Sequence, residues 1–148
     1  MQKTIWEKYA EVLVDYSTNV QKGDLVVIRA ESMYAKELVR AVYKRVLERG
    51  GNPVVRTSFG DMAELFINNA SEEQLDYIDP MTKLEYESVD KYISIGAPLN
   101  TKNMARVDLE KLSRRGKATK QLSEILMKRS AEGTAKWVIA DVPTHALA

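Results

Sequence analysis

The chain has 148 residues, of which 45% are hydrophobic and 29% charged, with 22 basic against 21 acidic side chains. A chain of this length can bury a full hydrophobic core as one domain, and its net charge of +1 argues against a nucleic-acid or membrane surface. It has no cysteine, which excludes a disulfide framework, a thiolate zinc site, an iron–sulfur cluster and a cysteine nucleophile.

The first residues carry charges where a signal peptide would need its apolar stretch. No later uncharged run approaches the roughly 18 residues of a membrane span. We therefore predict a cytoplasmic protein with neither a membrane nor a nucleic acid as partner.

The first half of the chain predicts two helices and two strands. A helix is expected over residues 4–19, with one apolar stripe at spacings of three and four: Ile5, Tyr9, Val12, Leu13 and Tyr16. The apolar run 25–28 predicts a strand covered on both faces. A helix from about 33 to 49, ended by Gly50 and Gly51, should turn these residues inward: Leu38, Val39, Val42, Val46 and Leu47. Residues 53–57 predict a strand whose leading proline suits an edge position.

The second half predicts mainly helices. Asp61 is expected to cap a short helix through Ala70, and residues 71–74 have the spacing of a capping box. Asp79-Pro80 should break that element, and a weak helical pattern at 83–88 precedes a strand at 91–95. Residues 108–129 have helical spacing, but Gly116 leaves one bent helix or two helices open. The last predicted strand is 137–140.

This order of elements predicts an α/β fold, with a mostly parallel sheet of about four strands and helices on both faces. The sequence contains no internal repeat and no linker-like tract. We therefore predict a single α/β domain over residues 1–148.

The sequence offers little catalytic chemistry. Gly50 and Gly51 follow a helix rather than a strand, so we interpret them as a helix end and not as a phosphate loop. His145 is the only histidine and has no Asp, Glu or His at i+3 or i+4, which favours a surface or packing role over metal ligation. The carboxylates are scattered. We therefore nominate no catalytic residue and no metal ligand in this chain.

Two groups of residues could still contact a partner. A basic cluster on the predicted helix 108–129 could meet phosphates or the acidic face of a partner, but a solvated outer helix face is the favoured explanation: Lys111, Arg114, Arg115, Lys117 and Lys120. Ligands of parallel sheets bind beyond the carboxyl ends of the strands. The residues at those ends are candidate cavity-lining residues, or alternatively caps and turn formers: Glu31, Ser58, Asn100 and Asp141.

Segments spread over the whole chain resemble one family of proteins. In chain order they are 8–11 with 15–17, 20–26, 47–55, 70–77, 95–101 and 137–144, including Lys22-Gly23-Asp24 and Ile95-Gly96-Ala97-Pro98. Their order and spacing are similar to the opening of the aminopeptidase T and aminopeptidase S family.

This resemblance implies a metal-dependent exopeptidase that removes amino-terminal residues from peptides with two divalent ions, zinc or cobalt. It also implies a homodimer with an enclosed active-site cavity. Family members carry their metal ligands in the carboxy-terminal part, so we expect this chain to be the amino-terminal, non-catalytic domain of a longer enzyme, and to be inactive alone. The alternative is a stand-alone α/β module that binds a small ligand or a partner protein.

Overall fold

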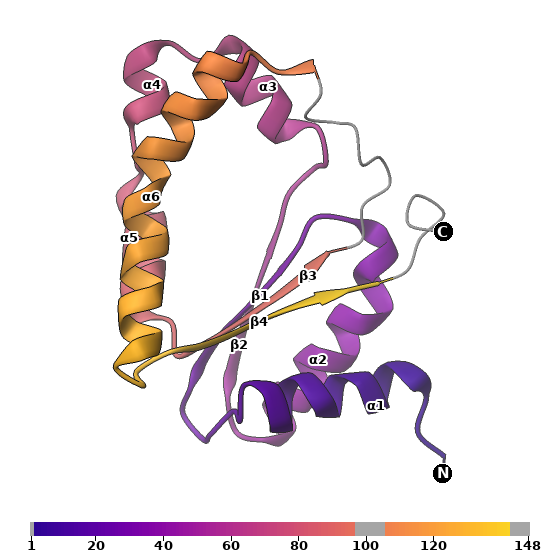
Figure 1. Ribbon diagram of the computed structural model, residues 1–148. Coiled ribbons are helices and arrows are strands. Elements are labelled where there is room, and N and C mark those ends of the chain that lie inside the picture. Colours follow the sequence, from indigo (N-terminus) through magenta and orange to yellow (C-terminus); the bar gives the residue numbers. More distant parts are fainter. Residues whose placement is uncertain (1, 97–105, 143–148) are drawn as a thin grey trace.

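The computed structural model describes residues 2–96 and 106–142, and a four-stranded sheet lies at their centre. The strands are β1 (Leu25–Ala30), β2 (Asn52–Thr57), β3 (Lys91–Gly96) and β4 (Lys136–Asp141). They lie in the order β2-β1-β3-β4, and every neighbouring pair is parallel (Figure 1). The predicted parallel α/β sheet is therefore confirmed.

Helices near the amino terminus cover the first face of this sheet. They are α1 (Ile5–Glu11), the π-helical turn η1 (Val12–Ser17), the short 3₁₀ turn η2 (Met33–Ala35) and α2 (Lys36–Glu48). Alternate residues of the strands point to this face and form the largest buried cluster, which includes Val26, Ile28, Ile93, Ile95 and Ala140. This cluster is the main hydrophobic core of the domain.

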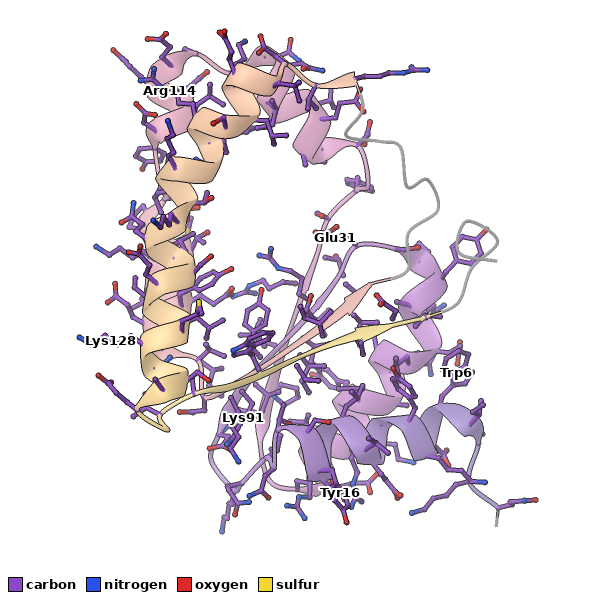
Figure 2. The ribbon with its side chains drawn as sticks, in the orientation of Figure 1. Trp6, Tyr16, Glu31, Lys91, Arg114 and Lys128 are labelled. Carbon is purple, nitrogen blue, oxygen red and sulfur yellow. The ribbon has the colours of Figure 1, made fainter. Side chains whose placement is uncertain are left out.

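The apolar stripe predicted for the first helix does not face this core. Of its five residues only Leu13 is buried, whereas Ile5, Tyr9, Val12 and Tyr16 are exposed, Tyr16 to 89%. In Figure 2, Tyr16 points away from the sheet. The helix has a second, inward row made of Trp6, Ala10, Leu13 and Val14. Two apolar rows on one short helix made the sequence pattern ambiguous, and the π-helical turn changes the helical period after Glu11.

An ion pair fixes this amino-terminal helix to α2. The guanidinium of Arg45 donates two hydrogen bonds to the carboxylate of Asp15, at 3.0 and 2.5 Å. Arg45, with a smaller contribution from Arg49, holds the pKa of Asp15 below its usual value. The side chains of both partners are about one quarter exposed, so the pair is partly shielded from water.

Helix α2 follows its predicted pattern with one exception. Leu38, Val42 and Val46 are buried, while Leu47 is exposed, so its predicted inward position is wrong. The predicted glycine end of the helix is confirmed. Gly50 has a φ of +82°, and the amide of the following glycine donates to the carbonyl of Val46 at 2.9 Å.

The second face of the sheet has its own helical layer, made of α3 (Met62–Asn69), α4 (Glu72–Asp76), α5 (Pro80–Ser88) and α6 (Leu109–Ala131). This layer approaches the sheet near the amino ends of the strands and stands away from it toward their carboxyl ends (Figure 1). The contact is a small cluster of Val27, Val89 and Tyr92 with Leu126 of α6 packed against it. Helices thus lie on both faces, but they cover the second face only in part.

The start of α5 differs from the sequence prediction. Asp79-Pro80 separates α4 from α5, as predicted, but it also begins α5 three residues earlier than expected. The carboxylate of Asp79 accepts a hydrogen bond from the amide of Thr82, and the proline occupies the first turn, where its missing amide costs nothing. Dipeptides of this kind are start signals as well as breaks.

Gly116 lies inside one continuous helix, which decides between the two alternatives that its position left open. A Cβ at Gly116 would have no atom within 4 Å. We expect Gly116→Ala to raise the free energy of unfolding by about 0.5–1 kcal/mol, because alanine loses less backbone entropy in a helix. Urea titration followed by circular dichroism measures this. Gly133→Ala is the contrasting variant: its φ of +78° strains any other residue, so a gain of stability there would contradict the reasoning.

Candidate functional site

Three of the four candidate residues lie at the carboxyl end of the sheet, where the parallel strands end. Glu31 and Ser58 directly follow β1 and β2, and Asp141 ends β4. Their side chains are exposed, and Figure 2 shows Glu31 at the end of its strand. Asn100 lies outside the described residues, as does His145. Among the described residues no hydrogen bond or ion pair joins Glu31, Ser58 and Asp141. They share the carboxyl end of the sheet, but Ser58 follows β2 and Asp141 ends β4, which are its two opposite edge strands.

Gly96, the last residue of β3, lies at the same carboxyl end of the sheet, and sequence analysis did not identify it as functional. It is the register partner of Asp141, and a Cβ on it would lie 2.8 Å from Oδ1 of that carboxylate. A glycine therefore lets the Asp141 carboxylate lie directly over β3. The only sequence signal was its position at the predicted close of a strand.

Arginines occupy the middle of the second sheet face. Arg29 and Arg56 are register partners on β1 and β2, and Ser94 follows on β3 in the same row. Nε of Arg56 donates to Oε1 of Glu85 at 2.8 Å. Arg29 is half-buried, and among the described residues no carboxylate pairs with it. Sequence reasoning ended the first strand at residue 28 and so missed this side chain.

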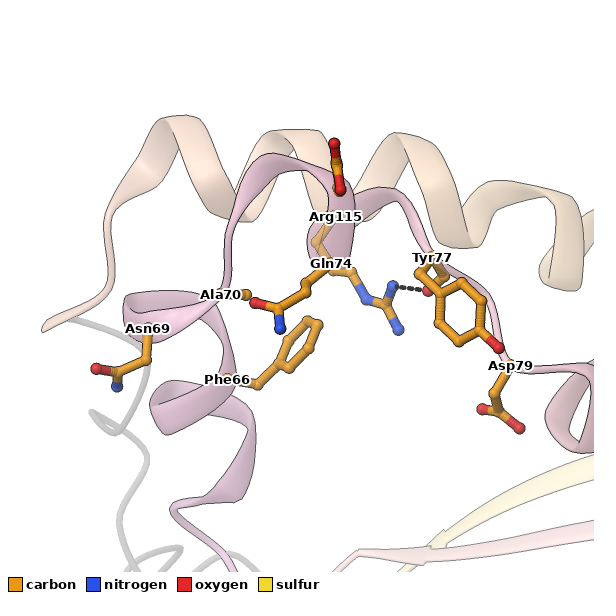
Figure 3. A pocket seen from close by; sticks show the side chains of 8 residues that line it. Phe66, Asn69, Ala70, Gln74, Tyr77, Asp79 and Arg115 are labelled. Carbon is orange, nitrogen blue, oxygen red and sulfur yellow. Dashed lines mark hydrogen bonds between the residues drawn. The ribbon is translucent and has the colours of Figure 1, made fainter.

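A cavity of about 660 Å³ lies between α3, α4 and α6 (Figure 3). Phe66, Tyr77 and Arg115 contribute to its lining. The guanidinium of Arg115 lies 4.9 Å from the centre of the Phe66 ring and donates to the carbonyl oxygens of Leu75 and Tyr77, at 3.0 and 2.7 Å. These contacts join the end of α4 to α6, so the arginine has a structural task here.

Three further cations of the basic cluster, Arg114, Lys111 and Lys120, also contact the protein itself. Arg114 donates two hydrogen bonds to the carboxylate of Asp76, at 2.8 and 2.6 Å, and holds the pKa of that group below its usual value. Nζ of Lys111 donates to the carbonyl of Asn68, and Lys120 lies 3.8 Å from Glu124. Contacts with neighbouring segments therefore account for Lys111, Arg114 and Arg115.

The described residues do not fit a metal centre. Within 2–96 and 106–142, no three His, Cys, Asp or Glu side chains gather closely enough to hold an ion. Three of the carboxylates already accept structural hydrogen bonds: Asp24 from the Gln21 amide, Asp90 from the Leu25 amide, and Asp79 from the Thr82 amide as a helix cap. A hydrolytic centre needs at least three convergent ligands, and this part of the chain does not provide them. In the same ranges no helix is both long and apolar enough to cross a membrane.

Comparison with known proteins connects this fold to an enzyme family. The solved structure of wild-type AmpT from Thermus thermophilus is similar, with a TM-score of 0.72 and 20% sequence identity. The match covers 94% of this chain but only 36% of AmpT, so the chain spans about a third of that protein. The crystal structure of CurK enoyl reductase has a TM-score of 0.38 at 15% identity, over 89% of this chain and 51% of that one. No curated protein matches the sequence.

The family assignment comes from a sequence-family model. The model of the thermophilic metalloprotease (M29) family matches residues 2–148, which is nearly the entire chain. It agrees with the ordered segments that resemble aminopeptidases T and S, and with the fold shared with AmpT. The chain therefore belongs to the M29 family of thermophilic metalloproteases.

Proposed function

We propose that this chain is the amino-terminal, non-catalytic domain of a metal-dependent aminopeptidase that removes amino-terminal residues from peptides. The observation that carries the proposal is that the family match spans nearly the whole chain, while the chain spans only 36% of AmpT. The poor fit of the described residues to a metal centre supports the proposal that the metal ligands belong to another part of the enzyme. Two divalent ions, zinc or cobalt, would then be bound by the rest of the enzyme and would supply Lewis-acid chemistry for peptide hydrolysis there.

In this proposal the domain shapes the access of peptides to a centre held elsewhere. Its open strand ends present Glu31, Ser58 and Asp141, which together with Asn100 are the proposed lining of the substrate cavity. Charged and polar side chains at this edge suit the polar backbone and charged amino terminus of a peptide. The complete enzyme is proposed to be a cytoplasmic homodimer, as the resemblance to aminopeptidases T and S implies.

The first test is an activity assay on the 148-residue protein. Incubated with a leucine chromogenic amide and added cobalt or zinc, it should release no more chromophore than buffer with the same metal, because residues 2–96 and 106–142 offer no ligand set. The matched control is the longer protein encoded by the same reading frame, which should be active and inhibited by a chelator. Robust, chelator-sensitive turnover by residues 1–148 alone would contradict the proposal.

The reading frame itself distinguishes the proposal from the alternative of a stand-alone module. A frame that continues with several histidines and glutamates supports an aminopeptidase. A natural stop codon directly after Ala148 would favour a binding module instead.

A further inference from the structure

The second face of the sheet carries exposed apolar side chains at the β4 edge. The exposed fraction is 46% for Trp137 and 65% for Ile139. Val138 and Ala140, which alternate with them, point to the opposite face and belong to or pack against the main core. Strands of parallel sheets are normally covered on both faces. On the second face, β4 therefore carries apolar side chains like those of a core, but no described residues bury them.

The free edge of β4 points to the same region. Among the described residues β4 pairs only with β3 and ends the sheet, as β2 does on the other side. The two edges differ in sequence. β2 contains Pro53 and the exposed, polar Arg56 and Thr57, which disfavour further pairing, whereas β4 has Trp-Val-Ile-Ala and no proline. The β4 edge is thus the one suited to accept another strand.

Charge on this face defines the covering element further. Arg29 lies in the same row of the sheet as Ile139, with only Ser94 between them. Its neighbour Arg56 is paired with Glu85, while Arg29 has no such partner among the described residues. A half-buried guanidinium is stabilised when a carboxylate is brought to it. The cover should therefore be apolar toward β4 and acidic toward β1.

The handedness of the fold says from which side the cover comes. The connection from β1 to β2 contains α2, which lies on the first face. The connections from β2 to β3 and from β3 to β4 run across the sheet in the opposite direction, and their helices α3–α6 lie on the second face. All three are then right-handed, as almost all such connections are. A further right-handed crossover, from β4 to a strand beyond it, would lay its helix on the second face.

We propose that the face formed by Trp137, Ile139 and Arg29 is the docking surface of an amphipathic helix, followed by a strand that pairs in parallel with the free edge of β4. The helix presents an apolar stripe to Trp137 and Ile139 and a carboxylate to Arg29. This inference rests on the proposed function, because the helix and strand belong to the polypeptide that follows in the longer aminopeptidase. The sheet of the enzyme then continues beyond β4 into that following polypeptide.

Tryptophan fluorescence tests the docking directly, since the chain has only Trp6 and Trp137. In the Trp6→Phe variant of the 148-residue protein, Trp137 reports alone; in the longer protein every tryptophan beyond residue 148 is also replaced by phenylalanine, so that Trp137 reports alone there too. Acrylamide should quench it readily in the 148-residue protein and several-fold less in the longer protein, with a blue shift of its emission. The Trp137→Phe variant is the matched control: Trp6 packs against the main core in both proteins, so its quenching should be the same in both. Equal quenching of Trp137 in the two proteins overturns the inference.

A second measurement does not depend on fluorescence. Ile139→Lys should leave the stability of the 148-residue protein nearly unchanged but destabilise the longer protein, whereas Met127→Lys, also at an exposed apolar residue, should affect neither. An unaffected longer protein overturns the inference.

The outcomes separate this inference from the proposed function. An active longer enzyme with a fully quenchable Trp137 refutes the docking surface and leaves the function intact. A longer protein that shows protection but no peptidase activity refutes the function alone, and a frame that closes at residue 148 refutes both. Protection that rises with the concentration of the 148-residue protein, together with dimers in ultracentrifugation, would identify a second copy as the occupant and overturn the inference.

Discussion

Ile28→Ala is expected to lower the free energy of unfolding by about 2–5 kcal/mol, the usual range for truncating a fully buried isoleucine. Ile28 lies in β1, which pairs with both β2 and β3, and its side chain is fully buried between the sheet and the helices of the first face. The rigid strands around it cannot move in to fill the space that the substitution leaves. Guanidinium titration of the 148-residue protein, followed by circular dichroism, measures the loss.

Ile139→Ala is the matched control in the same protein. It removes the same atoms from the same sheet, but at a side chain that is 65% exposed, so we expect a loss below about 1 kcal/mol. Similar losses at the two positions would mean that the first face is not the main core. The comparison also bears on the docking surface, because in the longer enzyme the cost at Ile139 should rise toward the cost at Ile28.

The sheet could be predicted from the sequence because its strands carry local signals. Residues 25–28 are apolar and rich in β-branched side chains, and residues 91–95 contain Tyr92, Ile93 and Ile95. Each segment follows an aspartate, and both strands lie within a residue or two of their predicted bounds. The parallel order follows from the alternation with helices. Pairing partners such as Val27 and Tyr92 were not predictable, because register depends on contacts between distant segments.

Helix orientation could be predicted only where the apolar pattern is unique. In α2 one row, Leu38, Val42 and Val46, clearly exceeds the others, and it is buried as expected. In α1 the rows containing Tyr9 and Ala10 are both apolar, and the row with the tyrosines is the exposed one. A count of hydrophobic residues therefore chose the wrong row, since small alanine packs closely against the sheet and contributes little to such a count.

The candidate site stays a prediction, of which the sequence gives only the position in the fold. Parallel strands end on the same side of the sheet, which is enough to expect Glu31, Ser58 and Asp141 at its carboxyl end. The contact between Asp141 and Gly96 and the position of Arg29 depend on the register of the sheet. Neither could be read from spacing along the chain.

Gly51→Ala is expected to destabilise the protein by about 1–3 kcal/mol through steric overlap. A Cβ at Gly51 would lie 2.8 Å from Cγ1 of Val20 and 2.9 Å from Cγ1 of Val46, both well inside normal contact distance. Both valines are fully buried in the main core, so neither can turn toward solvent to make room. Thermal unfolding of the variant should give a clearly lower midpoint.

Gly60→Ala provides the control, because a Cβ there would meet nothing within 4 Å and Gly60 does not have a positive φ. Its unfolding midpoint should stay close to that of the unaltered protein, or rise slightly as the unfolded chain loses entropy. The double variant Gly51→Ala with Val20→Ala should recover part of the loss at Gly51, since removing Cγ1 of Val20 opens the space that the new methyl group needs. If the losses at Gly51 and Val20 instead add fully, the close approach of α2 to the segment before β1 is not what requires a glycine at this position.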